Sequence, residues 1–252
     1  MIEESPSPAL SPAKRQEICD AAAGIATAAK YNSAGTVEFL YTDDGDFFFL
    51  EMNTRIQVEH PVTEMTYGID LVGWQIRIAA GETLSLQQQL LIPTGHAIEC
   101  RICAEDAFND FMPETGEVLF VKAPQTKNVR FDSGLYQNQQ ITTAFDPMLA
   151  KLVVYADTRE QAIVAMIDAL KELVILGVKT NIDYLLALLN HPKFSTGDFD
   201  TGFIKKNTIQ KIQPTAIEKM AALALAMQSD PEIQSLSNAT PETYKKIGSW
   251  SN

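Results

Sequence analysis

The sequence contains few cysteines: only Cys19, Cys100 and Cys103 among 252 residues. An odd, scattered set does not form the disulfide framework of a small secreted domain, so we expect a reducing compartment, the cytoplasm. Cys100 and Cys103 form a C-x-x-C pattern, but no second pair completes a zinc site. They also lie in an alternating segment, in which positions three apart face opposite sides. We therefore interpret both as structural residues.

Long apolar runs and an excess of positive charge are also missing. No run approaches the roughly 20 residues of a membrane helix, and the start MIEESPSPALSPAKRQ lacks the basic and apolar regions of a signal peptide. With 20 Lys and Arg against 32 Asp and Glu, the net charge is −12 and the pI about 4.7. This balance disfavours general attraction to nucleic acids or anionic lipids, so we predict no nucleic-acid and no membrane partner. Any bound phosphate must be held locally.

Several common catalytic motifs are absent as well. The sequence has no G-x-x-x-x-G-K-[ST] loop, no G-x-G-x-x-G, and no supported Ser/His/Asp or Cys/His arrangement. The three histidines, His60, His96 and His191, are isolated in the sequence. Because His60 and His191 each precede a proline, we expect loop or capping roles for them.

The length and the 46% hydrophobic content allow one large or two smaller domains with real cores. Ser11 before Pro12 predicts the start of a helix that runs to about Lys30. The segments TVEFLYT and FFFLEMN flank DDGD and predict a hairpin with strands near 36–42 and 47–53. A second helix is predicted over 70–80.

The second half of the sequence has a different pattern, with short strand-like segments separated by turns. From about Thr94 we predict short, mostly antiparallel strands, and Thr158 with Gln161 forms a capping box before the next helix. Thr180 is predicted to cap a further helix that Pro192 stops. We also expect one helix near 215–228, followed by 24 linker-like residues at the end of the chain.

The hairpin brings two acidic residues together. If Asp44 and Gly45 are the central turn residues, cross-strand partners have numbers that sum to 89, and Glu38 lies opposite Glu51. Facing like charges destabilise a sheet unless something compensates them. Two carboxylates about 5 Å apart are oxygen ligands for a hard divalent cation. Asn53 continues on the same face and can add an amide oxygen.

The stretch EMNTRIQVEHPVTEM, residues 51–65, carries polar residues at every second position. Strand alternation would place Arg55 on the same side as Glu51 and Asn53. A cation next to a guanidinium can bind and neutralise a polyphosphate. The alternative is the solvated polar face of a half-buried hairpin. Spacing alone leaves both interpretations open.

Four segments in the same order resemble the second half of the biotin carboxylase family, over roughly residues 1–206: AGTVEFLY, EMNTRIQVEHPVTEM, GHAIECRICAED and FDPMLAKLVVY. That family is the ATP-grasp component of acyl-CoA and pyruvate carboxylases. Other ATP-grasp enzymes, such as carbamoyl phosphate synthetase, share E-M-N-x-R but not Q-V-E-H-P-V-T-E.

The resemblance implies an α+β fold in three parts. Residues 1–89 would be the C-terminal part of an ATP-grasp domain. Residues 90–206 would be the biotin carboxylase C-terminal domain, a mostly antiparallel β subdomain with packed helices. Residues 207–252 would be a helix and linker toward a missing downstream region.

The resemblance also implies a nucleotide and metal site. Glu38 and Glu51 would bind the Mg²⁺ or Mn²⁺ ions that bridge the phosphates of ATP, with Asn53 in the same cluster. Leu40 and Leu50 would be the apolar residues near the adenine.

In this family pattern, Arg55, Gln57 and Val58 would fix bicarbonate by side-chain and backbone donors, and Glu59 would be the base that removes its proton. Attack on the γ-phosphate gives carboxyphosphate, which decomposes to carbon dioxide and phosphate. The phosphate then deprotonates the ureido nitrogen of biotin, and Arg101 would stabilise the ureido oxyanion. Without the family pattern, Arg101 between Glu99 and Glu105 reads equally well as a salt-bridged surface residue.

The chain also departs from the family pattern. Its opening resembles an interior segment; the glycine-rich lid and the upstream lysines and histidine are missing, and no Ala-Met-Lys-Met biotinylation motif is present. We therefore expect a fragment of a longer subunit, nearly inactive alone, whose partners are a biotin carrier domain and a carboxyltransferase subunit; the resemblance also implies a homodimer, which the family commonly forms. VKTNIDYLLALLNHPKF favours an acyl-CoA carboxylase α subunit of the methylcrotonyl type.

Two other hypotheses stay open. One is an ATP-grasp ligase with a different acceptor, which would be indifferent to biotin. The other is a non-catalytic assembly module, in which the β region and helices over 159–190 make subunit contacts.

Overall fold

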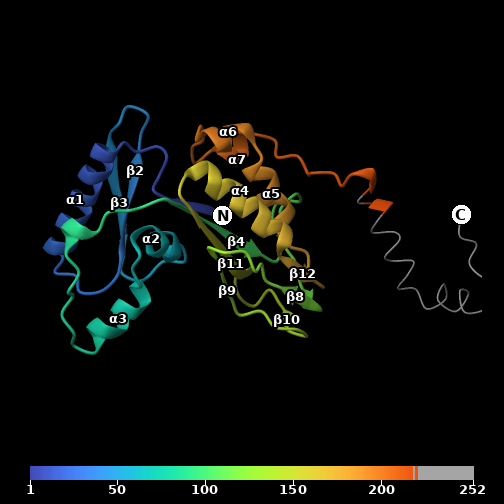
Figure 1. Ribbon diagram of the computed structural model, residues 1–252, viewed down its shortest axis with the longest axis horizontal. Coiled ribbons are helices and arrows are strands. Elements are labelled where there is room, and N and C mark those ends of the chain that lie inside the picture. Colours follow the sequence, from blue (N-terminus) through green and yellow to red (C-terminus); the bar gives the residue numbers. More distant parts are fainter. Residues whose placement is uncertain (218, 221–252) are drawn as a thin grey trace, which may run out of the picture. The chain divides into compact units, whose positions relative to one another are not determined.

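A four-stranded antiparallel sheet lies at the centre of the unit formed by Met1–Lys211 in the computed structural model (Figure 1). The structure describes residues 1–217, 219 and 220. Most of the helix expected near 215–228, and the whole C-terminal linker, lie outside the described residues. In order across the sheet, the strands are β1 (Ile2–Ser5), β4 (His96–Cys103), β11 (Met148–Ala156) and β9 (Val129–Ser133).

One face of this sheet is apolar. Alternation along β4 and β11 directs Ile98, Ile102 and Leu152 to this face, and all three are fully buried. Two helices cover it, α4 (Arg159–Glu172) and α5 (Ile182–Leu189). They contribute apolar residues at helical spacing, among them Met166 and Leu185. This cluster is the main hydrophobic core.

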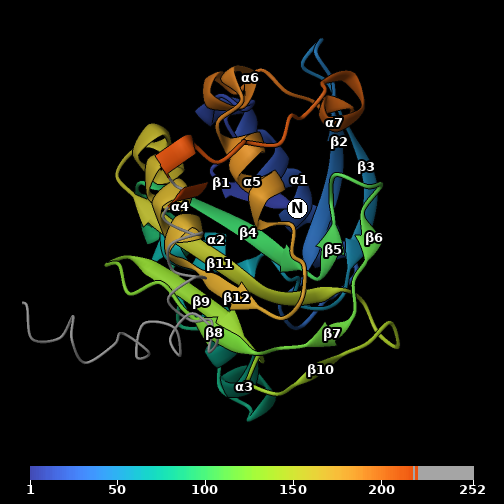
Figure 2. The same cartoon turned by 90° about the vertical axis from the view of Figure 1, so that its right-hand side faces the viewer.

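The opposite face lies under α2 (His60–Tyr67), on the other side of the sheet from α4 and α5 (Figures 1 and 2). Its apolar part is small, with Val62 against Ala97 and Val153. Several other positions on this face carry charges, including Arg101 and Lys151, which are direct cross-strand partners. Charged groups are therefore placed between the central sheet and α2.

The predicted hairpin is a separate two-stranded sheet of β2 (Thr36–Tyr41) and β3 (Phe47–Asn53). On one of its faces Phe39 and Phe47 make an edge-to-face contact with ring centroids 5.4 Å apart. The helix α1 (Pro12–Ala28) lies beside that face, and the ammonium of Lys14 sits 5.6 Å from the Phe47 ring centre. The Ser11 hydroxyl accepts a hydrogen bond from the Lys14 amide at 3.2 Å, which confirms the predicted cap.

The remaining elements are short. The helix α3 (Leu71–Ala79) begins after its N-cap Asp70, in agreement with the prediction for 70–80. The others are η1 (Gln88–Leu90), β5 (Glu105–Asp106), β6 (Met112–Pro113), β7 (Gly116–Glu117), β8 (Phe120–Lys122), β10 (Gln140–Ile141), β12 (Val174–Leu176), α6 (Pro192–Thr196) and α7 (Phe203–Lys206). No helix in the described residues is long and apolar enough to cross a bilayer.

Some local predictions hold and others fail. Thr158 caps α4 by accepting from the Gln161 amide at 3.3 Å, and His191 caps α6. The cap predicted at Thr180 is wrong, because α5 starts after Asn181, whose buried side chain bonds to the β4 backbone instead. β1 and α2 were not predicted from the sequence.

His96 is not isolated. It is buried on β4, and its Nε2 lies 2.7 Å from the Glu4 carboxylate on β1. Arg159 of α4 bonds to the same carboxylate, also at 2.7 Å. Burial, the largest single influence, raises the pKa of Glu4, but the hydrogen bonds from His96 and Arg159 and the nearby Arg159 charge together lower it below its ordinary value.

Glu99 is the least satisfied charged group of the central sheet. It is fully buried on the α2 side, and neither carboxylate oxygen has a hydrogen-bond partner among the described residues. Burial raises its pKa to about 7, against the opposing effect of the Lys151 and Arg101 charges. The folded protein therefore holds a proton on Glu99 over a pH range in which the unfolded chain releases it.

This gives a testable pH dependence. Because the folded pKa lies above the ordinary value of 4.5, Glu99 contributes stability that is complete below about pH 4.5 and is lost as the pH rises toward 7. Between about pH 5 and pH 8, we expect the free energy of unfolding of Glu99→Gln to rise by roughly 2 kcal/mol relative to wild type. Urea unfolding at several pH values measures this difference. The exposed Glu117→Gln is the control, and a pH-independent difference for Glu99→Gln would contradict the assignment.

Candidate active site

The hairpin turn is one residue longer than predicted. The Thr42 amide donates to the Asp46 carbonyl at 2.9 Å, and Gly45 takes a left-handed φ of +86°. Next to the turn, Tyr41 pairs with Phe47, so partner numbers there sum to 88. The two-residue turn at Asp44 and Gly45 was therefore wrong.

A β-bulge compensates for the longer turn. The register shifts between Glu38 and Phe39, which leaves Leu50 as the additional residue on β3, and Glu38 lies directly opposite Glu51 as predicted. Leu40 pairs with Phe48, so alternation places Leu40 and Leu50 on the same hairpin face as Glu38. The two carboxylates and the two leucines thus share one face.

The two carboxylates converge on one amide. The Asn53 amide nitrogen donates to Glu38 Oε1 at 2.8 Å and to Glu51 Oε1 at 3.0 Å. The Gln57 amide nitrogen donates to the same Glu38 oxygen at 2.8 Å. A hydrogen-bond donor therefore lies between the acids, where it offsets their repulsion.

These side chains fit a hard divalent cation. Carboxylate oxygens are its preferred ligands, and a half-turn of the Asn53 amide would present an oxygen instead of the nitrogen. The described residues contain no cluster of three or more His, Cys, Asp or Glu side chains of metal-binding type. The set is two carboxylates plus an amide, a small protein contribution that suits Mg²⁺ bound mainly by phosphates and water.

The regular alternation after Asn53 does not continue as a strand. β3 ends at Asn53, and Arg55 and Gln57 lie in a loop that leads to α2, whose N-cap position is Glu59. The placement of Arg55 by strand alternation was therefore wrong. The side chains of Arg55, Gln57 and Glu59 nevertheless line one cavity of about 410 Å³.

Arg101 joins this loop to the central sheet. Its guanidinium Nη2 donates to Glu59 Oε2 at 2.7 Å and lies 3.4 Å from Glu3 Oε1. The arginine predicted to stabilise an oxyanion is thus paired with the carboxylate predicted to act as a base. Its partners are not the sequence neighbours Glu99 and Glu105 that the alternative interpretation would use.

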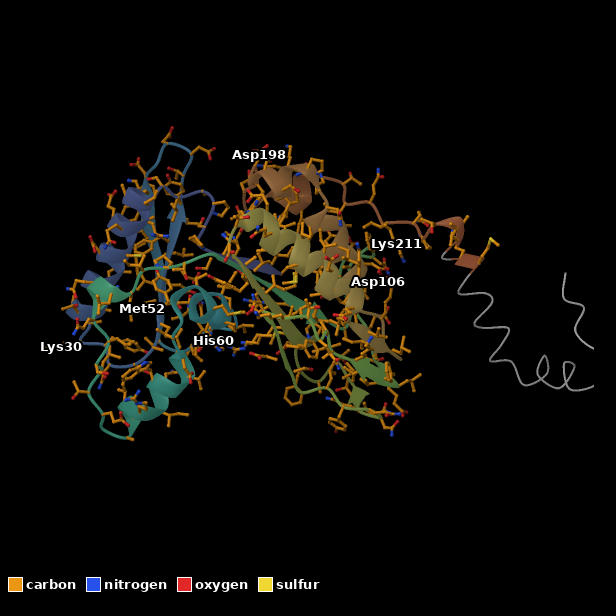
Figure 3. All side chains as sticks on the ribbon, in the orientation of Figure 1. Lys30, Met52, His60, Asp106, Asp198 and Lys211 are labelled. Carbon is orange, nitrogen blue, oxygen red and sulfur yellow. The ribbon has the colours of Figure 1, made fainter. Side chains whose placement is uncertain are left out.

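Sequence reasoning missed three residues of this region. Asn181 donates to the Arg101 carbonyl at 3.0 Å and accepts from the Cys103 amide at 2.9 Å, so its side chain fixes the backbone of β4 at Arg101. Lys151 donates to the Val58 carbonyl at 2.7 Å. His60, the first residue of α2 (Figure 3), contacts the Gln57 carbonyl through Nδ1 at 2.8 Å. The one available signal was Lys151, a lone charge in the apolar strand MLAKLVVYA.

The three cysteines are all free thiols, and burial raises the pKa of Cys103 to about 11 and raises the pKa of Cys100 still further. A raised pKa keeps Cys100 and Cys103 protonated, so neither is activated as a nucleophile, in agreement with the predicted structural role.

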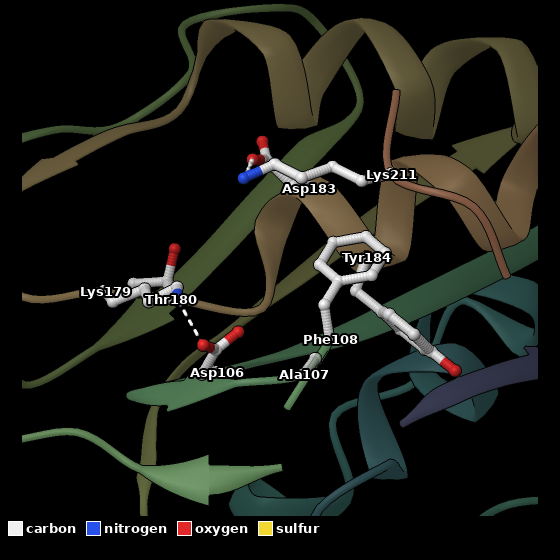
Figure 4. A pocket seen from close by; sticks show the side chains of 8 residues that line it. All are labelled: Asp106, Ala107, Phe108, Lys179, Thr180, Asp183, Tyr184 and Lys211. Carbon is white, nitrogen blue, oxygen red and sulfur yellow. Dashed lines mark hydrogen bonds and ion pairs between the residues drawn. The ribbon is translucent and has the colours of Figure 1, made fainter. Parts of the chain in front are cut away.

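Other hollows lie in the same unit, and two of them are relevant to the predictions. One, of about 770 Å³, lies between the hairpin end and α6–α7 and is lined by Leu40, but Leu50 is not part of its lining. The other, of about 200 Å³, is drawn in Figure 4. There Lys179 is paired with Asp106 and Lys211 with Asp183, so its charges already compensate each other.

Family models match most of the described chain. Residues 1–87 match the ATP binding domain of the carbamoyl-phosphate synthase L chain, and residues 99–206 match the biotin carboxylase C-terminal domain. The chain is 45% identical to the α subunit of methylcrotonoyl-CoA carboxylase from Mus musculus, over 82% of this chain and 29% of that protein. It is 47% identical to biotin carboxylase 1 of Bacillus subtilis, over 81% and 46%.

Solved structures agree. The biotin carboxylase domain dimer of Hydrogenobacter thermophilus 2-oxoglutarate carboxylase, in complex with MgADP, ADP and bicarbonate, matches with a TM-score of 0.80 at 40% identity. The match covers 82% of this chain and 46% of that one. The chain therefore spans less than half the length of these relatives. It belongs to the biotin carboxylase family, of which it carries the C-terminal part of the ATP-grasp domain and the biotin carboxylase C-terminal domain.

Proposed function

We propose that this chain forms the metal, bicarbonate and oxyanion side of a biotin carboxylase active site. The complete enzyme would be an ATP-dependent ligase that carboxylates biotin on a carrier domain through carboxyphosphate, within an acyl-CoA carboxylase. The supporting relatives include both separate biotin carboxylases and α subunits of methylcrotonoyl-CoA carboxylase.

One observation carries this proposal: the loop over residues 54–59 is hydrogen-bonded both to the hairpin carboxylate pair and to the central sheet. Gln57 bonds to Glu38 of the hairpin carboxylate pair at 2.8 Å. Two residues later, Glu59 bonds to Arg101 of the central sheet at 2.7 Å. These contacts support the proposal because they join the residues proposed to hold the cation, the bicarbonate and the ureido oxyanion in one continuous set.

Glu38 and Glu51 would hold the cation with Asn53. A magnesium ion there neutralises the phosphates of ATP and supplies charge for phosphoryl transfer. The chain's own contribution is to keep two acids on one rigid hairpin face, which the bulge at Leu50 and the bridging Asn53 amide maintain.

The loop residues would bind and activate bicarbonate. Arg55 and Gln57 provide donors that line the same cavity as the Glu59 carboxylate. Val58 would add its backbone N–H. Glu59 accepts a hydrogen bond from Arg101, so its carboxylate orientation is set before it takes the proton from bicarbonate.

Arg101 would stabilise the ureido oxyanion of biotin. A guanidinium that is already fixed aims its donors at the developing charge without reorganisation. Arg101 is fixed by its strand, by Asn181 behind its carbonyl, and by Glu59 in front.

Further parts of the proposal concern the rest of the protein. Leu40 and Leu50 would contact the adenine, and the boundary between the two family domains would fall at 89 and 90. We also propose a biotin carrier domain and a carboxyltransferase subunit as partners, a dimer of this half, and a cytoplasmic location.

A chimera tests the activity. Residues 1–206 would replace the matching segment of the Bacillus subtilis biotin carboxylase, which is 47% identical. We expect ATP hydrolysis that requires bicarbonate, and carboxylation of free biotin. Arg101→Met should lower kcat by about 100- to 1000-fold while MgATP binding is kept, since Arg101 lies on the biotin side. Arg77→Met, a surface arginine on α3, is the matched control.

Two results would contradict this assignment. ATP hydrolysis that is indifferent to biotin would favour a ligase with a different acceptor. Full activity in the Arg101→Met chimera would show that the arginine has no part in the chemistry.

Metal binding can be measured on the isolated chain. We expect Mn²⁺ to broaden the NMR signals of the β2 and β3 amides around Glu38 and Glu51, and Glu51→Gln to weaken Mn²⁺ binding by at least about tenfold. Because the substitution removes one of two facing like charges, the hairpin should lose no stability. Asp44→Asn, on the exposed turn of the same hairpin, should bind Mn²⁺ as wild type does. Equal Mn²⁺ binding by wild type, Glu51→Gln and Asp44→Asn would contradict the proposed cation site.

A further inference from the structure

The loop segment Gln57–Val58–Glu59 is held by the backbone as well as by side chains. The Gln57 carbonyl is 2.8 Å from His60 Nδ1 and also accepts from the His60 amide at 3.4 Å. A carbonyl can only accept, so Nδ1 carries the proton in this contact. The Val58 carbonyl accepts from Lys151 Nζ at 2.7 Å. Two successive carbonyls of the loop thus each have a side-chain donor.

These two contacts fix the peptide planes on both sides of Val58. The Gln57 carbonyl and the Val58 N–H belong to one planar peptide unit, so holding the carbonyl sets the direction of that N–H. The Val58 carbonyl belongs to the next unit, with the Glu59 N–H. Among the described residues, the Val58 N–H itself has no hydrogen-bond partner, so it remains available as a donor.

The donor Lys151 is itself firmly placed. It lies in β11, an interior strand of the sheet, where its neighbours are Arg101 on β4 and Asp132 on β9. Its side chain is only 13% exposed, and its ammonium is 3.7 Å from the Asp132 carboxylate. Cross-strand partners in the sheet therefore hold successive loop residues: Lys151 holds Val58, and Arg101 holds Glu59.

The donor His60 is anchored from the other side. Its Nε2 lies 3.8 Å from Glu64 one turn along α2, and Glu64 is buried and bonded to Arg130 at 2.6 Å. Arg130 in turn pairs with Asp132, the partner of Lys151. These contacts form a closed ring that joins α2 to β9 and β11. The loop 57–59 is part of this ring, through the contacts of His60 with Gln57 and of Lys151 with Val58.

We propose that Lys151 and His60 are positioning residues for bicarbonate: together they orient the Val58 N–H relative to the Gln57 amide and the Glu59 carboxylate, so that a small planar oxyanion finds its donors already in place. Neither side chain needs to touch the anion for this role. The inference rests on the proposed function of the loop and adds to it the two residues that shape the site. Preorganised donors bind an anion with less loss of conformational freedom than donors on a free loop.

The test uses the chain itself, labelled with ¹⁵N and titrated with bicarbonate, with the Val58 amide signal as the readout. We expect saturable shifts in wild type. Lys151→Met and His60→Leu, which remove the donors, should weaken bicarbonate binding by about tenfold. His60→Asn keeps an amide nitrogen near the position of Nδ1 and should bind within about twofold of wild type.

A second readout separates positioning from general damage. Mn²⁺ binding at Glu38 and Glu51 should be unchanged in all three variants, because neither Lys151 nor His60 contacts these carboxylates and Asn53 of the hairpin itself bridges them. Loss of Mn²⁺ and bicarbonate binding together, or no rescue by His60→Asn, would overturn the positioning role. If Lys151→Met does not fold, the His60→Leu and His60→Asn pair decides the question alone.

The possible failures are distinguishable. If wild type binds bicarbonate and every variant binds it equally well, the positioning role is wrong and the proposed function stands. If bicarbonate leaves the Val58 signal of wild type unchanged throughout the titration, the loop is not the anion site, and the inference falls with that assignment.

Discussion

The site depends on the ion pair between Arg101 and Glu59, with its 2.7 Å contact. This pair connects the loop that follows the hairpin to the central sheet, because Glu59 lies at the end of that loop and Arg101 belongs to β4. Arg101 lies on β4, whose backbone pairs with β1 on one side and β11 on the other. The loop after the hairpin is therefore positioned by an interior strand of the central sheet, and the contact from Lys151 to Val58 repeats the arrangement one residue earlier.

The two faces of the central sheet have opposite tasks. The face under α4 and α5 is apolar and closely packed, and it provides the hydrophobic stabilisation of the unit. The face under α2 is less apolar and therefore contributes less hydrophobic stabilisation, because it carries charged side chains that are largely buried. The clearest case is Glu99, whose carboxylate oxygens have no hydrogen-bond partner among the described residues. A buried carboxylate beside Arg101 and Lys151 costs stability, and such costs are typical of sites that are arranged for chemistry.

Local signals in the sequence predicted most of the longer helices and strands and one central feature of the site. Caps at Ser11 and Thr158 were visible because a cap needs only a hydroxyl and nearby amides. The pairing of Glu38 with Glu51 was predicted from a turn that is one residue too short, and it holds because the bulge cancels that error. Contacts made across the fold were not predictable. The contact of Lys151 with Val58, 93 residues away in sequence, leaves no local pattern, and the alternation after Asn53 resembled a strand although the chain turns there toward α2.

The bulge at Leu50 also changes what a single strand can present to a ligand. In a regular strand, side chains on one face are two residues, or about 7 Å, apart, and the residue between them faces away. In β3 the additional residue leaves Leu50 and Glu51 as immediate neighbours with the same orientation. An apolar side chain and an acidic one therefore lie next to each other on one face of β3, a spacing that a regular strand does not provide.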